Sequence, residues 1–248
     1  GYAEADPTFD VEGIDAAHKL TILASIAYGI PLQFARCYTE GISKITQDDV
    51  EYAEELGYRI KHLGVSRQTE KGIDLRVHPT LIPEARPIAK VDGVLNAVMV
   101  NGNAVGDTLY GGAGAGAGPT ASAVVADIID LARTLEADAA ARVNHLAYNE
   151  IENEQVLPIE EVETSYYLRI QVQDKTGVLA SVATILSERG INIEAIIQKE
   201  PKEGEELAQI ILLTHRIVEK TMNGAIAAIQ ALDSTVGDVT RIRVEHLD

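Results

Sequence analysis

The segment YYLRIQVQDKTGVLASVATILSERGINIEAIIQKE, residues 166–200, contains a strand, a helix and a second strand in direct succession. Apolar and polar residues alternate over 166–174, which is typical of a strand. Over 177–190 the apolar residues follow helical spacing between two glycines, and residues 191–200 are again rich in isoleucine. This segment therefore predicts two strands joined by a helix.

The rest of the chain extends the same pattern. A polar turn, PKEGEE, is followed by a strand at 207–215, a helix at 219–232 and a last strand at 239–247. Residues 166–248 therefore have the order βαββαβ, which is the split βαβ plan of ferredoxin-like domains.

The preceding part of the chain mixes helices with strands in a less regular order. Its spacing predicts a helix at 13–28, an amphipathic helix at 43–64, a half-buried strand at 74–82, strands at 94–102 and 103–110, and a helix at 120–135. The two neighbouring strands are expected to form a hairpin that turns at Asn101–Gly102 or Gly102–Asn103. The fold class is therefore expected to be α+β, with helices packed on one face of a mixed sheet.

Composition limits the function classes. The net charge of -17 disfavours nucleic acids and anionic membranes as partners. A single cysteine, Cys37, cannot form an internal disulfide, which favours a cytoplasmic location. No apolar run approaches the roughly 20 residues that span a bilayer, and no signal peptide is expected. The missing initial methionine suggests a trimmed chain or a domain from something longer.

The first twenty residues, GYAEADPTFDVEGIDAAHKL, combine five carboxylates with one lysine. Asp10 is placed to cap the first predicted helix or to lie just before it, while Asp15 and Lys19 stand four residues apart on one helix face. One interpretation is a solvated terminus with a surface ion pair. The other is a polar pocket, because burial of this helix would favour a neutral amine suited to proton transfer. Carboxylates such as Glu4, Asp10 and Asp15 would then bind the ammonium group of an amino acid.

These residues resemble the catalytic domain of homoserine dehydrogenase. GYAEADPTFDVEGIDAAHKL contains the family signature G-Y-x-E-x-D-P followed by D-x-x-G-x-D-x-x-x-K. The resemblance extends through EGISKIT, LGYRIKHLG, HPTLIP, VDGVLNAV and YGGAGAGAGPTASAVVADI, and so covers roughly residues 1–135. It implies NAD(P)-dependent interconversion of L-homoserine and L-aspartate 4-semialdehyde, a step of threonine and methionine biosynthesis.

The resemblance also implies roles for five residues. Lys19 matches the lysine that exchanges a proton with the substrate oxygen during hydride transfer. Glu4 matches a substrate-binding glutamate, and Asp10 and Asp15 match acids that bind the amino and hydroxyl groups of homoserine. Tyr2 would line the same pocket through its backbone or its ring.

Two other residues of this segment, Phe9 and His18, are given no role in the site. Phe9 stands where some relatives carry another acid, so the pocket is expected to be less charged here. His18 is interpreted as a helix-surface residue and not as a catalytic one. The chain has no cluster of histidine and cysteine with metal-ligand spacing, and the reaction needs no metal, so no metal site is expected.

The glycine-rich segment GGAGAGAGPTAS, residues 111–122, satisfies the relaxed fingerprint G-x-G-x-x-A. The required context is absent, because no parallel strand ending in an acid follows the helix. A flexible linker is also disfavoured, because Pro119 and Thr120 open a strong helix. In the resembling family this loop closes over the nicotinamide side of the cofactor. The residues expected to contact the cofactor are Gly112, Gly114, Gly116 and Thr120.

Homoserine dehydrogenases also carry an N-terminal Rossmann domain, and nothing in this chain corresponds to it. NAD(P) is therefore expected to be bound mainly by a domain absent from this chain, and the chain alone is expected to be inactive. The preference between NAD and NADP stays open at this point.

The segment DKTGVLASVATILSERGINIEAI, residues 174–196, resembles the ACT domain, a regulatory βαββαβ unit that binds amino acids, often between paired copies. Backbone amides at the start of its helix would bind a carboxylate. The expected effector is threonine, the end product of the pathway. A module that only dimerises and binds no ligand is the alternative. The residues expected to bind the effector are Asp174, Gly177, Val178, Leu179 and Asn192.

The sequence thus predicts a catalytic domain at 1–140, a linker at 141–165 and an ACT domain at 166–248. Exposed sheet edges in such a domain favour a homodimer or homotetramer. Two other functions stay open: an amino-acid sensor without enzymatic activity, and a scaffold that only pairs subunits.

Overall fold

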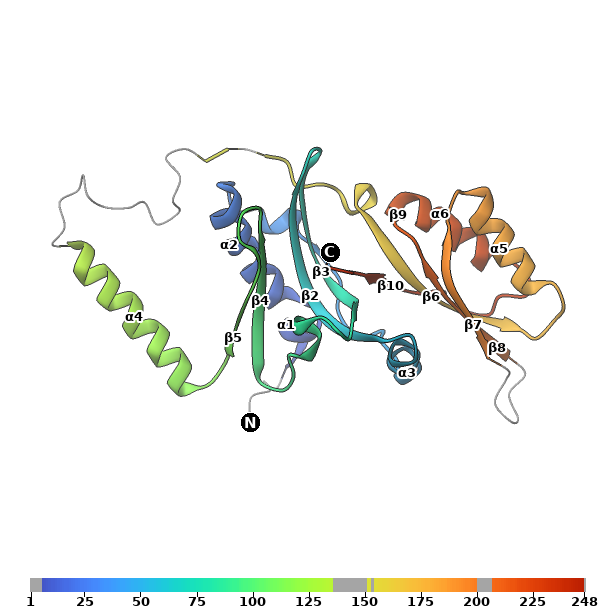
Figure 1. Ribbon diagram of the computed structural model, residues 1–248, viewed down its shortest axis with the longest axis horizontal. Coiled ribbons are helices and arrows are strands. Elements are labelled where there is room, and N and C mark those ends of the chain that lie inside the picture. Colours follow the sequence, from blue (N-terminus) through green and yellow to red (C-terminus); the bar gives the residue numbers. More distant parts are fainter. Residues whose placement is uncertain (1–5, 136–150, 153, 200–206, 248) are drawn as a thin grey trace.

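The computed structural model describes residues 6–135, 151–152, 154–199 and 207–247. Helices and strands are interspersed along these residues (Figure 1). The helices are α1 (Thr8–Val11), α2 (Ile14–Tyr28), α3 (Gln47–Glu55), α4 (Ala117–Leu135), α5 (Val178–Glu188) and α6 (Glu219–Gln230). The strands are β1 (Tyr38–Thr39), β2 (Tyr58–Thr69), β3 (Gly72–Pro83), β4 (Leu95–Gly102), β5 (Gly106–Ala113), β6 (Glu163–Gln173), β7 (Ile193–Lys199), β8 (Leu207–Thr214), β9 (Ile217–Val218) and β10 (Thr240–Val244).

One mixed sheet runs through both halves of the chain. Its order is β1-β3-β10-β6-β8-β7, with β2 paired to β3 and β9 paired to β6. The strand β10 pairs antiparallel with β6 on one side and parallel with β3 on the other. The α+β class is therefore confirmed, and the two halves share a sheet.

The C-terminal half has the predicted βαββαβ order. Its helices α5 and α6 pack on one face of the sheet around a core that includes Tyr166, Leu168, Val182 and Met222. The short strand β9 before α6 is an addition that the sequence pattern did not predict. The other face of the same strands is covered by α3, where Ala53 packs near Tyr167.

The predicted helix at 43–64 is wrong in its second half. The helix α3 begins with a capping box at Thr46 and ends at Glu55, and Gly57 then adopts φ +82°. Residues 58–69 form β2, which pairs antiparallel with β3 along its whole length. Pairing with β3 outweighs local helical propensity here, because tertiary contacts routinely override it.

The predicted strand at 74–82 exists as part of β3, but it is not half-buried. The residues of β3 between its two ends are almost all buried. The reason is that β2 occupies one edge of β3, while β1 and β10 occupy the other. A strand with partners on both edges and cover on both faces is buried throughout its length.

The predicted hairpin exists, but its turn lies further along the chain. Gly102 pairs with Gly106, so the connection consists of Asn103, Ala104 and Val105. The helix α4 lies at the end of the molecule opposite α5 and α6, whereas the hairpin lies further inward (Figure 1). The helix α4 has no buried residue, although its position agrees with the predicted helix at 120–135.

Candidate functional site

The candidate site is built on the turn that leads into α2. Gly13 is the residue before this helix and adopts φ +78°, a left-handed conformation that favours glycine. A Cβ atom at this position would lie 2.8 Å from the ring of His62. Asp10 lies just before α2, which is one of its two predicted placements; it does not cap α2, because it belongs to the separate helix α1, where its backbone oxygen accepts from the amide of Gly13.

Lys19 and Asp15 form the predicted pair on α2. The Lys19 Nζ donates to Asp15 Oδ2 at 2.5 Å. The side chain of Lys19 is 63% exposed and that of Asp15 is 35% exposed, so the expected burial of this part of the helix is wrong. The helix contacts the sheet through small residues, among them Ala17 and Ala24, which leaves its ion pair facing outward.

His18 lies on the helix surface, as predicted. Its ring stacks on that of Phe34 with 3.9 Å between centroids, and on that of Phe9 with 5.9 Å. The aromatic ring of Phe9 therefore packs against a side chain of α2. The predicted site residues Tyr2 and Glu4 lie outside the described residues.

The segment after β1 supports the turn before α2. Glu40 accepts through its backbone oxygen from His62 Nε2 at 3.0 Å, and the amide of Ile42 donates to the Val11 oxygen at 3.0 Å. The hydroxyl of Ser43 donates to Glu12 Oε1 at 2.9 Å. These contacts were missed by sequence reasoning, because no local pattern relates the two segments.

The glycine-rich loop connects β5 to α4. Gly116 adopts φ +116° just before the helix, and the amide of Thr120 donates to its oxygen at 3.1 Å. A Cβ at Gly112 would meet nothing within 4 Å, whereas one at Gly114 would lie 2.1 Å from Asn96 Nδ2. Because β5 pairs antiparallel with β4, the loop does not join two parallel neighbouring strands within the described residues.

The predicted effector residues lie at two ends of α5. Gly177 precedes the helix with φ +89° and Asp174 is exposed nearby, whereas Asn192 follows the helix and is exposed before β7. An eleven-residue helix is about 16 Å long, so one small ligand cannot contact both ends within one copy. Val178 is buried, and Leu179 packs against the core. Only their backbone groups are available to a ligand.

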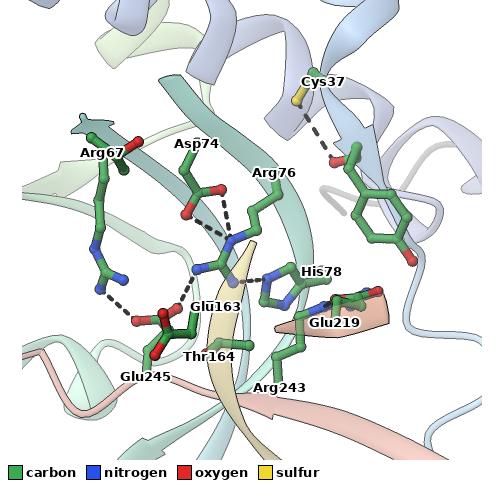
Figure 2. Close-up of polar contacts among 12 residues, drawn as sticks. Cys37, Arg67, Asp74, Arg76, His78, Glu163, Thr164, Glu219, Arg243 and Glu245 are labelled. Atoms are coloured by element: carbon green, nitrogen blue, oxygen red, sulfur yellow. Dashed lines mark hydrogen bonds and ion pairs between the residues drawn. The ribbon is translucent and has the colours of Figure 1, made fainter. Parts of the chain in front are cut away.

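A cluster of buried ion pairs joins β3 to the residue that follows β10. Arg76 Nε donates to Asp74 at 2.9 Å and its Nη2 to Glu245 at 2.5 Å, while Arg67 donates to the same Glu245 (Figure 2). Burial alone would raise the pKa of the Glu245 carboxyl, but the two guanidinium groups outweigh it and hold the pKa below its usual range. These ion pairs bridge the two halves of the chain.

Arg243 on β10 forms a second buried cluster. Its Nε and Nη2 donate to Glu219 at 2.7 and 2.6 Å, and its Nη1 donates to Glu40 Oε2 at 2.8 Å. The hydroxyl of Tyr38 also donates to Glu40 Oε2 at 2.7 Å. Burial by itself would raise the pKa of Glu40, but the Arg243 guanidinium lowers it below its usual value. Sequence reasoning missed this cluster as well.

The described residues contain no group of three or more histidine, cysteine, aspartate or glutamate side chains arranged to bind a metal ion. No helix in the same part of the chain is long and apolar enough to cross a membrane.

Comparison with known families matches residues 1–129, more than half of the chain, to homoserine dehydrogenase. The chain belongs to the homoserine dehydrogenase family. Residues 166–234 match the ACT domain. The N-terminal match contains Asp10, Asp15, Lys19 and the glycine-rich loop.

Several homoserine dehydrogenases are similar to this chain over its whole length. The one from Pseudomonas aeruginosa is 66% identical, and the alignment covers 100% of this chain and 58% of that protein. The one from Neisseria gonorrhoeae is 58% identical, with 100% and 57% covered. The chain therefore spans little more than half the length of these relatives.

Solved structures show the same relation. The crystal structure of a homoserine dehydrogenase from Thiobacillus denitrificans matches with a TM-score of 0.93 and 59% identity, over 99% of this chain and 56% of that one. The homoserine dehydrogenase of S. aureus at pH 7.5 matches with a TM-score of 0.69 and 26% identity, over 98% and 56%.

Proposed function

We propose that this chain forms the substrate-binding and regulatory part of an NAD(P)-dependent homoserine dehydrogenase, which interconverts L-homoserine and L-aspartate 4-semialdehyde in threonine and methionine biosynthesis. The observation that carries the proposal is the pair of Lys19 and Asp15, exposed on α2 within the segment that matches the family. An ammonium and a carboxylate that face outward are available to a substrate, whereas a purely structural pair gains little at such an exposed position.

Lys19 is proposed as the catalytic residue. Oxidation of the homoserine hydroxyl releases one hydride from carbon and one proton from oxygen. NAD(P), when bound, would supply the redox chemistry by taking up the hydride. Lys19 accepts the proton in this direction as a neutral amine and, as an ammonium, returns a proton to the aldehyde oxygen in the reverse direction.

The carboxylates are proposed to bind the substrate. Asp15 lies beside Lys19 and so is placed to orient the reacting hydroxyl group. Asp10, exposed on α1, and Glu4 would bind the amino group of homoserine, with Tyr2 lining the same site. This set contributes negative charge around a substrate that carries an ammonium, which favours binding of an amino acid.

The glycine-rich loop is proposed to contact the nicotinamide side of NAD(P). The open space at Gly112 and the left-handed backbone at Gly116 fit close approach of a flat ring to the backbone. Thr120 can contribute only its hydroxyl, because its amide already donates within the helix. Gly114 packs against Asn96 and would act by shaping the loop. The proposal assigns most of the cofactor contacts to a domain outside these residues, so that the 248 residues alone are inactive.

We further propose the domain division 1–140, 141–165 and 166–248, with threonine as the effector of the ACT domain. The family matches at 1–129 and 166–234 support this division. Because Asp174 and Asn192 lie at opposite ends of α5, an effector that contacts both requires two copies of the domain. Calorimetric titration of threonine into the chain tests this: wild type should release heat and Asp174→Asn should not, while Glu188→Gln, at the last residue of α5, should bind normally. Absence of heat with the wild type would leave only a pairing role.

We propose a homodimer or homotetramer in the cytoplasm. Burial raises the pKa of the Cys37 thiol to about 11, so this cysteine stays protonated near neutral pH and is suited to a reducing compartment. Apolar side chains exposed on the hairpin support self-association. They include Val98, Val100 and Tyr110.

The function is tested by joining the chain to the N-terminal part of the Pseudomonas aeruginosa relative. Purified fusion should reduce NAD or NADP only when homoserine is present. Binding of homoserine without turnover would instead indicate an amino-acid sensor. Neither binding nor turnover, in a folded fusion, would indicate a scaffold that pairs subunits.

A further inference from the structure

The last strand of the ACT unit is part of the sheet that carries the candidate substrate site. Arg243 of β10 pairs with Thr80 of β3 in parallel register and with Tyr166 of β6 in antiparallel register. Beyond the strand, the amide of Glu245 donates to the Leu81 oxygen at 3.0 Å. A displacement of β10 relative to β6 therefore also acts on β3 and on the residues bound to it.

Arg243 connects the two halves through its side chain as well. Its guanidinium is buried, with 1% of the side chain exposed, and donates to Glu219, the first residue of α6, and to Glu40, which follows β1. The same guanidinium lies 4.7 Å from the centre of the Tyr38 ring. The three nitrogens of this guanidinium are divided between two carboxylates. A shift of Glu219 therefore moves the guanidinium and changes its hydrogen bond to Glu40.

Glu40 lies at the start of the segment that supports α2. Its backbone oxygen accepts from His62, whose ring packs against Gly13. Two residues later, the amide of Ile42 donates to the oxygen of Val11. The segment from Glu40 to Ile42 therefore fixes the turn before α2, the helix that carries Asp15 and Lys19.

The packing at this turn leaves no room for a side chain at either of two glycines. A Cβ at Gly41 would lie 2.3 Å from Glu12 Oε2 and 2.8 Å from the Glu12 Cα. A Cβ at Gly13 would lie 2.8 Å from the ring of His62. Tightly packed groups transmit a displacement to their neighbours, because protein interiors are dense and poorly compressible.

We propose that Arg243 is a positioning residue for the substrate site: by binding Glu40 and Glu219 together, it sets the position of the α2 N-terminus according to the state of the ACT unit. The inference rests on the proposed function, because it takes Asp15 and Lys19 as the site that is positioned. It adds a physical connection between the regulatory unit and that site which neither family match contains.

Hydrogen exchange of the chain tests the connection without any activity. Glu40→Gln keeps the shape of the side chain and its bond to Tyr38 but removes the charge that Arg243 binds. Amides of the peptide at 11–22 should exchange about tenfold faster in this variant, because hydrogen bonds to charged groups are the stronger class. Peptides from β7 and β8 should exchange as in the wild type.

Two further variants test whether the effect depends on the bond between Arg243 and Glu40. Arg243→Lys keeps the positive charge, but a lysine side chain has a single nitrogen and cannot bind both carboxylates in the same fixed geometry. This variant should therefore also speed amide hydrogen exchange in the peptide at 11–22. Arg241→Gln is the matched control, since Arg241 lies on the same strand and contacts Glu219 at 3.2 Å, with no bond to Glu40. Unchanged exchange at 11–22 in Glu40→Gln, or an equal increase over all peptides, would overturn the proposal.

Kinetics of the fusion enzyme provide an independent measure. Glu40→Gln should raise the KM for homoserine severalfold and leave the KM for the nicotinamide cofactor unchanged, because the hydrogen bonds of Glu40 go to Tyr38, His62 and Arg243. An equal change in both constants would contradict a role in positioning α2. If the wild-type fusion is inactive, the proposed function fails, whereas the exchange result still reports on the connection.

Discussion

Arg76 Nη1 lies 2.7 Å from Nε2 of His78, and both side chains are completely buried. Because a guanidinium can only donate, Nε2 of the imidazole must accept, and the proton resides on Nδ1, which lies 2.9 Å from the Pro79 oxygen. His78 is therefore neutral and in a single tautomer. Burial first, and then the charges of Arg243 and Arg76, hold the pKa of His78 well below its usual value.

This arrangement predicts a loss of stability at mildly acidic pH. The unfolded chain protonates its histidines below about pH 6.5 and the folded chain does not protonate His78, so the free energy of unfolding falls as the pH drops below that value. From pH 7 to pH 5 the loss due to His78 should be about 2 kcal/mol. Urea unfolding of His78→Gln, whose amide oxygen can accept from Arg76, should show a shallower pH dependence. An unchanged slope would contradict the assignment of a neutral His78.

Loss of the ion pair between Asp49 and Arg169 is expected to lower stability strongly. Its buried carboxylate accepts from Arg169 Nε at 2.6 Å and from Nη2 at 3.1 Å, joining α3 to β6. Arg169→Met leaves this carboxylate without its cation, which should lower the free energy of unfolding by about 3–5 kcal/mol. Lys199→Met, which breaks an exposed pair with Glu55, is the control and should change it little. Equal effects of the two substitutions would show that Asp49 is not the anchor of α3.

Lys19 predicts a catalytic effect without an effect on folding. In the fusion enzyme, Lys19→Ala should lower kcat for homoserine oxidation by about 10²–10⁴-fold, the usual range for loss of a general acid or base. Asp15→Asn should mainly raise the KM for homoserine. Thermal unfolding should be unchanged in both, because the pair is exposed. Lys71→Ala, in the turn between β2 and β3, is the matched control; a normal rate in Lys19→Ala would refute the assigned role.

The hairpin predicts an effect on assembly. Val98 and Val100 expose 41% and 47% of their surface on the face of β4 away from Met99. Val100→Glu should weaken self-association measured by sedimentation velocity, because a charge would be buried between copies. Val105→Glu, at the exposed tip of the hairpin, should sediment as the wild type does. If Val100→Glu sediments as the wild type, this face is not the contact between copies.

The elements of the C-terminal half could be predicted because each has its own spacing of apolar residues and its own boundary residues. The helix at 177–190 stands between two glycines, and observed α5 falls within it. The strand β2 was missed because Gln47–Glu55 and Tyr58–Thr69 follow one another closely, with only Leu56 and Gly57 between them. Alternation of Tyr58 and Ile60 with Arg59 and Lys61 was the available signal.

The candidate site could be predicted only in part. Asp15 and Lys19 are four residues apart on one helix, so their contact follows from helical geometry. The outward position of Lys19 could not be predicted, because Ile22 and Leu23 on the same helix are also exposed despite being apolar. Contacts such as Arg243 with Glu40 join residues 203 positions apart, which no local pattern encodes.

The place of β10 between β3 and β6 has a consequence for synthesis of the protein. The two strands on either side of β10 are synthesised before it. Arg76 on β3, for example, bonds to Glu245, which lies 169 positions later in the chain. A nascent chain on the ribosome therefore exposes two unpaired strand edges until β10 has emerged. Such edges are templates for intermolecular pairing, so the interval before β10 pairs is when this sheet is most exposed to aggregation.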